Sequence, residues 1–188
     1  TGLPLLVDTC HAGLAEAALA AGADAINDIT GLRGDAEMPG VVARHGAALV
    51  AMHNQRGREQ RDVAGDIREG FELTLAIAAA AGIEPGRVVL DPGFGFGWKP
   101  EQNLEMVRRL PELWSMGMPL LLGPSRKSTI GMVLEAGVEG RGAGTAAAVA
   151  LCVAAGADVV RVHDVAEMVR VVRVADAITR ANWTAKPP

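Results

Sequence analysis

The sequence predicts an α/β protein, built as part of a (β/α)8 TIM barrel. One pattern recurs along the chain: an alanine-rich helical stretch stops at a glycine, and a short apolar run follows and ends on polar residues. Short apolar runs that alternate with helices of about 10–15 residues indicate βα units and a parallel sheet. A doubly wound open sheet is the competing arrangement. It concentrates its ligand at one switch point, whereas every expected strand here ends in chemically useful side chains, which favours the barrel.

Six βα units are expected in chain order. The sequence Ala-Ala-Gly-Ala-Asp occurs twice, at 20–24 and 154–158, each time before a short apolar run. The glycines Gly22, Gly82 and Gly156 stand where helix C-caps belong. The expected strands are residues 3–7, 23–26, 47–52, 87–90, 119–122 and 158–162.

Length and composition exclude several classes of protein. The chain has 188 residues, 49% of them hydrophobic, and a formal net charge of −4, which argues against a disordered chain and a nucleic-acid binder. Two cysteines are too few for a disulfide framework. The longest apolar stretches, 73–81 and 146–155, are far shorter than the ~18 residues of a membrane span, and no signal peptide is visible. We therefore expect a cytoplasmic protein with no membrane and no nucleic-acid partner.

The number of units is smaller than a whole barrel requires. A closed barrel needs eight strands and typically ~250 residues. The chain begins at Thr1 without a methionine, and an apolar run that is typical of a buried strand follows at once, at 3–7. We expect residues 1–188 to form a single barrel domain that lacks about two N-terminal units.

The most unusual stretch is the glycine-rich loop at 91–99, which follows the fourth expected strand. Glycine occupies every second position from Gly93 to Gly97, and half of the chain's six Phe and Trp residues lie here. Such spacing prevents a strand or helix and lets the backbone approach a ligand closely. A flexible hairpin whose aromatic side chains cover the barrel is the alternative. We favour an aromatic-lined ligand loop with Asp91 fixed at the strand end.

Two further loops carry cations. Arg126 and Lys127 precede an expected helix at 129–136, where they oppose the helix dipole unless an electron-rich ligand offsets them. Ser128 could be an ordinary N-cap, which would explain the serine and not the cations. Arg161 and His163 stand two residues apart on an expected strand, hence on one side of it, and need an anion or a structural salt bridge.

The remaining polar residues have plainer interpretations. Asp8 and Asn27 stand at strand ends, where each alone is often a helix N-cap. The charges at 56–61 and at 108–109 are most simply solvated faces, and no histidine is placed to activate Cys10 as a nucleophile. Three histidines are expected to be surface or loop residues, His11, His45 and His53.

Taken together, the loop at 91–97, the Ser-Arg-Lys-Ser sequence at 125–128 and the Arg-Val-His-Asp sequence at 161–164 resemble the motifs of dihydropteroate synthases. Their order and rough spacing match that family along essentially the whole chain. The resemblance implies a transferase of folate biosynthesis that joins 6-hydroxymethyl-7,8-dihydropterin diphosphate to p-aminobenzoate and releases diphosphate. It also implies Mg²⁺ as cofactor, a homodimer formed through the late helices, and a sulfonamide target.

The resemblance also implies a role for each matching residue. Asp8, Asn27, Asp91 and Lys127 would hold the pterin, and Arg161 would stack on it. Arg161 and His163 would grip the diphosphate, while Phe94, Phe96 and Ser128 would lie on the p-aminobenzoate side. The catalytic residues would be Lys127, Arg161 and Asp91, and no metal ligand is expected within this chain.

The chain departs from the family at two places. Trp98 and Lys99 stand where the family usually has Lys and Thr, and the family's two N-terminal loops, which contribute to metal, diphosphate and p-aminobenzoate binding, have no counterpart. We therefore expect residues 1–188 alone to be inactive. A pterin-binding methyltransferase and a catalytically degenerate pterin-binding subunit are the alternatives.

Overall fold

The computed structural model describes residues 2–181, 183 and 184, and within them six strands form one series of parallel neighbours. The first four form a continuous sheet in chain order. A parallel bridge between Leu90 and Leu120 brings the next segment beside it, and the last two strands pair with each other. The strands are β1 (Leu6–Asp8), β2 (Ala25–Asp28), β3 (Ala48–Met52), β4 (Val88–Asp91), β5 (Leu121–Leu122) and β6 (Val159–Val160).

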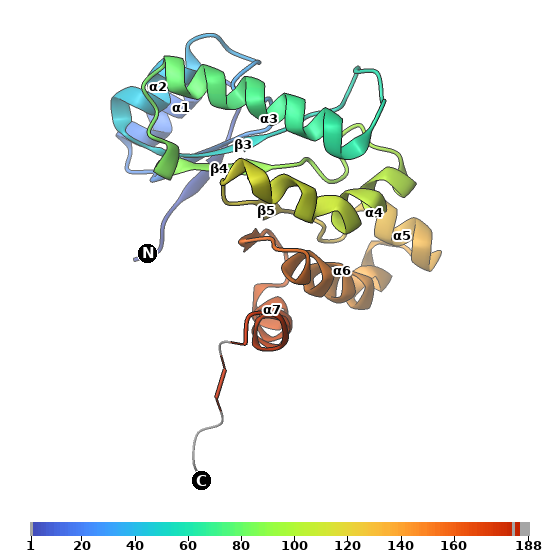
Figure 1. Cartoon of the computed structure of the whole chain (residues 1–188). Coiled ribbons are helices and arrows are strands. Elements are labelled where there is room, and N and C mark those ends of the chain that lie inside the picture. Colours follow the sequence, from blue (N-terminus) through green and yellow to red (C-terminus); the bar gives the residue numbers. More distant parts are fainter. Residues whose placement is uncertain (1, 182, 185–188) are drawn as a thin grey trace.

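Helices connect these strands, and Figure 1 shows them following one another from α1–α3, beside β3 and β4, to α7 at the other end of the molecule. Consecutive helices contact each other from α3 through to α7, and α1 contacts α2. The strand order never reverses, as it would at the switch point of a doubly wound sheet. The six units are thus the expected part of a (β/α)8 barrel. The helices are α1 (Ala12–Ala20), α2 (Met38–His45), α3 (Val63–Ala80), α4 (Pro100–Arg109), α5 (Ser128–Leu134), α6 (Gly142–Ala154) and α7 (Val165–Thr179).

The glycines that were expected to end helices do so. One alanine caps each of the helices α1, α3 and α6, and the glycine is the next residue. These glycines, Gly22, Gly82 and Gly156, have φ of 101°, 80° and 96°. Only glycine adopts such angles without strain, so the chain can leave each helix and enter the next strand.

The first strand differs from its prediction. β1 is only Leu6–Asp8, and Leu3 and Leu5 are largely exposed, so the expected buried strand at 3–7 is wrong. In contrast, Ile26 and Leu49 in the next two strands are fully buried. The reason is that β1 is an edge, paired with β2 alone, and apolar composition by itself does not tell an edge from the centre of a sheet.

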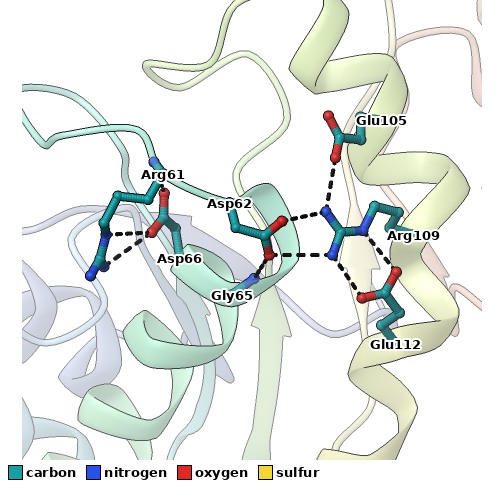
Figure 2. A network of polar contacts seen from close by, with 7 residues as sticks. All are labelled: Arg61, Asp62, Gly65, Asp66, Glu105, Arg109 and Glu112. Atoms are coloured by element: carbon teal, nitrogen blue, oxygen red, sulfur yellow. Dashed lines mark hydrogen bonds and ion pairs between the residues drawn. The ribbon is translucent and has the colours of Figure 1, made fainter.

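A network of charges joins α3 to α4 (Figure 2). Arg109 donates to Asp62 at 2.6 Å, Glu105 at 2.9 Å and Glu112 at 2.7 Å. Asp62 also accepts from the N–H of Gly65 at 2.8 Å and so caps α3. The expectation that Arg109 is merely solvated is therefore wrong, because three carboxylates converge on its guanidinium.

No helix among the described residues is long and apolar enough to cross a membrane.

Candidate functional site

The strand ends meet around one cavity of about 300 Å³. This is the geometry that parallel barrel strands impose, since all of them deliver their C-termini to the same rim. Five polar residues that the sequence analysis singled out line this cavity, namely Asn27, Asp91, Lys127, Arg161 and His163, and a sixth, Asp8, does not. The cavity is lined by Asn27, Ile29, Met52, Asp91, Phe94, Phe96, Gly123, Ser125, Lys127, Arg161, Val162 and His163.

Asp91, the last residue of β4, places a carboxylate at the floor of this cavity. Its side chain is buried, and among the described residues its only hydrogen bond comes from the N–H of Gly93 at 2.8 Å. Burial raises the pKa of Asp91 to about 6, against the opposing effects of that hydrogen bond and of the charges of Lys127 and Arg161. At neutral pH the group is thus an anion with acceptor capacity to spare.

Lys127 packs against the glycine-rich loop, with its side chain beside Gly95 and Phe96. Its ammonium nitrogen is 4.2 Å from the centre of the Phe96 ring, a cation–π contact, and the guanidinium of Arg56 lies over the same ring at 4.9 Å. Burial lowers the pKa of Lys127, and the nearby carboxylate of Asp91 acts in the opposite sense. A buried acceptor and a half-buried donor therefore line one cavity.

Asp8 does not line the cavity, but two bonds tie it to residues that do. It accepts from the side-chain amide of Asn27 at 2.6 Å and forms an ion pair with Arg161. About half of each side chain in this ion pair is exposed, 50% for Asp8 and 54% for Arg161. The structural salt bridge considered as an alternative for Arg161 thus exists, and Arg161 still lines the cavity with about half of its side chain exposed.

His163 is oriented by Ser125, the residue that faces it from the end of β5. The hydroxyl of Ser125 accepts from the backbone N–H of His163 at 3.2 Å and lies 2.9 Å from Nδ1 of its ring. With Nδ1 engaged in this way, Nε2 is the ring nitrogen left for a ligand. Sequence reasoning missed this role of Ser125, although its place beside two cations at a strand end was a signal.

The structure decides two points that the sequence left open in this loop. Arg126 does not line the cavity, because its guanidinium is bonded to Asp164 at 2.7 and 3.0 Å. Ser128 is not the N-cap of α5: Lys127 occupies that position, and Ser128 is the exposed first residue of the helix. The expected helix at 129–136 is observed one residue earlier and ends at Leu134.

The glycine-rich loop is held firmly and is not the flexible hairpin of the alternative reading. A side chain at Gly93 would collide with the carbonyl oxygen of His53, and one at Gly97 with the backbone of Gln55 and Arg56. The backbone N–H of Gly95 donates to Asn103 at 2.6 Å. The glycines thus allow the loop to pack directly onto the segment that follows β3.

The departure at position 98 is part of this packing. Trp98 is buried, donates to the carbonyl of Pro92 at 3.3 Å, and has its ring 5.7 Å from that of His53. His53 was expected at the surface or in a loop. It lies in the loop that follows β3 and is fully buried there, with Gln55 at 2.7 Å from Nε2. Burial lowers the pKa of His53 to about 4, so it is neutral. The aromatic content of the loop was the only feature of the sequence that indicated this packing of Trp98 against His53.

The profile of the family described as pterin binding enzyme matches residues 1–163 of the chain. The chain belongs to this family. The resemblance to dihydropteroate synthases assigned roles to a set of residues. Of these, the structure brings together at one cavity Asn27, Asp91, Lys127, Arg161 and His163, with the aromatic rings of Phe94 and Phe96.

Individual relatives agree with this. The chain is 42% identical over 187 residues to a dihydropteroate synthase of Synechocystis, covering 95% of this chain and 64% of the relative. Among solved structures it is similar to a dihydropteroate synthase of Clostridium difficile with pteroic acid (TM-score 0.92, 43% identity, 95% and 68% of the two chains). It is also similar to one from Xanthomonas albilineans with 4-aminobenzoic acid (TM-score 0.90, 38% identity, 95% and 66%). The chain spans less than two thirds of the length of the first curated relatives that it matches.

Proposed function

We propose that the protein is a dihydropteroate synthase. It joins 6-hydroxymethyl-7,8-dihydropterin diphosphate to p-aminobenzoate and releases diphosphate. The observation that carries this proposal is the composition of this cavity. It is lined by the buried Asp91 and the half-buried Lys127, together with Arg161 and His163. The dihydropteroate synthases to which the chain is similar support the same function.

The pterin half of the substrate fits the floor of the cavity. A pterin edge presents an amino group and a ring N–H, which the Asp91 carboxylate accepts, and the ring carbonyl accepts from Lys127. Asn27 adds an amide that Asp8 holds in place at 2.6 Å. The guanidinium of Arg161 lies flat against the ring, since guanidinium groups stack on aromatic faces.

The diphosphate half fits the cationic side. Arg161 and the Nε2 of His163 donate to its oxygens. In the reaction, the amine nitrogen of p-aminobenzoate forms a bond to the pterin methylene carbon as the bond from that carbon to the diphosphate oxygen breaks. The diphosphate leaves with the electron pair, and the amine loses one proton to solvent. Donors that strengthen their bonds as charge develops on the leaving oxygen lower the barrier of this step.

The p-aminobenzoate side is assigned to Phe94, Phe96 and Ser128. The two rings line the cavity, and Ser128 stands exposed at the start of α5, where a hydroxyl and the helix N–H groups suit a carboxylate. Sulfonamides resemble p-aminobenzoate in shape and charge, and we propose that they compete at this place.

Mg²⁺ remains part of the proposal for the whole protein. Among the described residues no group of three or more His, Cys, Asp or Glu side chains could hold a metal ion, and no step above depends on one.

We also propose that two copies associate through the late helices, in the cytoplasm. An apolar groove of about 660 Å³ runs between α4, α5 and α6. The side chains of Val133 and Leu151 are more than half exposed there, and burial of such a surface favours association. Sedimentation of the chain and of Leu151→Glu tests this: we expect a dimer that the charge dissociates, and a monomeric wild type would contradict it.

The proposed activity is tested in two steps. The first titrates 6-hydroxymethylpterin and diphosphate into the 188-residue chain, and we expect pterin binding that Asp91→Asn weakens at least tenfold. The second measures dihydropteroate with the full-length protein, Mg²⁺ and both substrates. Pterin binding without any product would instead support the degenerate-subunit alternative.

A further inference from the structure

Two neighbouring residues after β5 are bonded to two neighbouring residues after β6. Ser125 contacts His163, and the guanidinium of Arg126 donates to both carboxylate oxygens of Asp164, from Nε at 3.0 Å and from Nη2 at 2.7 Å. Within each pair the two bonded residues are 38 positions apart in the sequence. We call these four residues the clasp.

Arg126 has an unusual backbone in this arrangement. Its φ is 55°, in the left-handed region, which a residue with a side chain adopts at a cost in energy. Tertiary bonds hold it there: its N–H donates to the buried hydroxyl of Thr145 at 3.1 Å, and its carbonyl accepts from Arg141 at 2.8 Å. This turn sets the direction in which the next residue, Lys127, leaves the backbone.

We propose that Arg126 is a positioning residue, whose ion pair with Asp164 fixes Lys127 and His163 as one unit. Arg126 is not among the residues that line the cavity, yet its neighbour Lys127 and Asp164's neighbour His163 both line it. The two-pronged geometry of an arginine–carboxylate pair resists rotation, and lysine could not reproduce it. The inference rests on the proposed function in one respect, which is the identity of the ligands that Lys127 and His163 bind.

The consequence is a coupling between the two halves of the site. Lys127 stands on the pterin side and His163 on the diphosphate side, so a ligand that orders either loop also orders the other through the clasp. Diphosphate should therefore bind more tightly when a pterin is already present, and the reverse.

The test uses Arg126→Met and Asp164→Asn in the 188-residue chain. Both variants should fold, because Thr145 and Arg141 still hold the turn and Asp164 makes no side-chain hydrogen bond as N-cap of α7. The matched control is Arg44→Met, which removes an exposed ion pair of 2.8 Å with Glu16. Glu16 also contacts the ring of His45 at 2.6 Å, so this control changes the surroundings of a different histidine.

The first readout needs no ligand. The chain has four histidines, so their ring resonances can be assigned in ¹⁵N-histidine spectra. Arg126→Met and Asp164→Asn should shift or broaden the signals of His163 and leave those of His45, while Arg44→Met should do the opposite. His163 signals that stay at their wild-type positions in both clasp variants would overturn the proposal, whether or not the chain proves to bind pterin.

The second readout is the affinity for inorganic diphosphate with and without 6-hydroxymethylpterin. We expect both clasp variants to bind diphosphate about tenfold more weakly, the scale of one charge-assisted hydrogen bond, and to lose the enhancement by pterin, at an unchanged Tm. An enhancement equal to that of the wild type would also overturn the proposal. If Arg126→Met lowers the Tm, the diphosphate affinity of Asp164→Asn and its enhancement by pterin decide whether the proposal holds.

Discussion

Asp8, at the end of the first strand, forms an ion pair with Arg161, which follows the last strand 153 residues later. The contact joins the two edges of the six-stranded series, and each partner also has a place in the site: Asp8 holds Asn27, and Arg161 lines the cavity. A single ion pair thus joins the first strand to the residue that follows the last one, and both of its partners are also connected to the proposed substrate site.

The first prediction concerns that pair. Arg161→Met should weaken diphosphate binding by about 1.5–3 kcal/mol, the range for hydrogen bonds to charged groups. Its stability should change by less than about 1 kcal/mol, because half-exposed ion pairs contribute little. Calorimetry and thermal unfolding measure the two effects, with Arg44→Met as the control. Unchanged diphosphate affinity would reject the assignment of Arg161.

The second prediction concerns the pH dependence of pterin binding. The pKa of Asp91 is raised to about 6, and only the carboxylate form accepts both pterin N–H groups. Pterin affinity should therefore be constant above about pH 7 and fall roughly tenfold per pH unit below pH 6. Titrations between pH 4.5 and 8 check this, in buffers where the protein stays folded. In Asp91→Asn the remaining weak binding should no longer follow this curve.

The third prediction concerns stability. The pKa of Asp91 is near 3.8 in the unfolded chain and about 6 in the folded protein. Its contribution to the free energy of unfolding is therefore fully present below pH 3.8 and is lost as pH rises through 6. Asp91→Asn should thus exceed the wild type in free energy of unfolding at pH 7 by up to about 3 kcal/mol, and the difference should shrink toward pH 4.

His53 acts in the opposite direction over the same interval. Its pKa falls from 6.5 to about 4 on folding, so its contribution is present above pH 6.5 and is lost as pH falls through 4. In the wild type the effects of Asp91 and His53 on the free energy of unfolding have opposite dependence on pH. In Asp91→Asn only the effect of His53 should remain of these two, so the free energy of unfolding should rise with pH. Urea unfolding at several pH values tests both, and parallel curves for the two proteins would contradict the account.

The fourth prediction concerns the network of Figure 2. Replacing Arg109 by Met leaves the carboxylates of Asp62, Glu105 and Glu112 without their shared partner. We expect a loss of about 1–2 kcal/mol, or roughly 2–8 °C in Tm, that decreases at high salt. The control is Arg87→Met, which breaks one exposed pair with Glu84 and should cost no more than about 0.5 kcal/mol.

The sequence was sufficient for the fold class and for most of the cavity because both depend on local order. A strand end is visible where an apolar run meets a polar residue, so Asn27, Asp91 and Lys127 could be named, and parallel topology then brings such ends together. The helix-ending glycines were equally readable, since a positive φ is a property of one residue.

The errors have a common physical origin, which is dependence on a distant partner. Whether Arg126 faces a ligand or a carboxylate depends on Asp164, and whether His53 is buried depends on Gly70 and Trp98, which pack against it from another helix and another loop. The exposure of residues 3–6 depends on what lies beside an edge strand. No short-range pattern reports such facts.

The central claim is that Asp91 and Lys127 form the floor of a pterin site, and the most direct test is the affinity of the 188-residue chain for 6-hydroxymethylpterin at pH 7.5, measured by calorimetry. The account predicts one pterin per chain, bound at least tenfold more weakly by Asp91→Asn and by Lys127→Met, and equally well by Arg44→Met. Failure of the wild type to bind pterin, or the same affinity in Asp91→Asn, would contradict it.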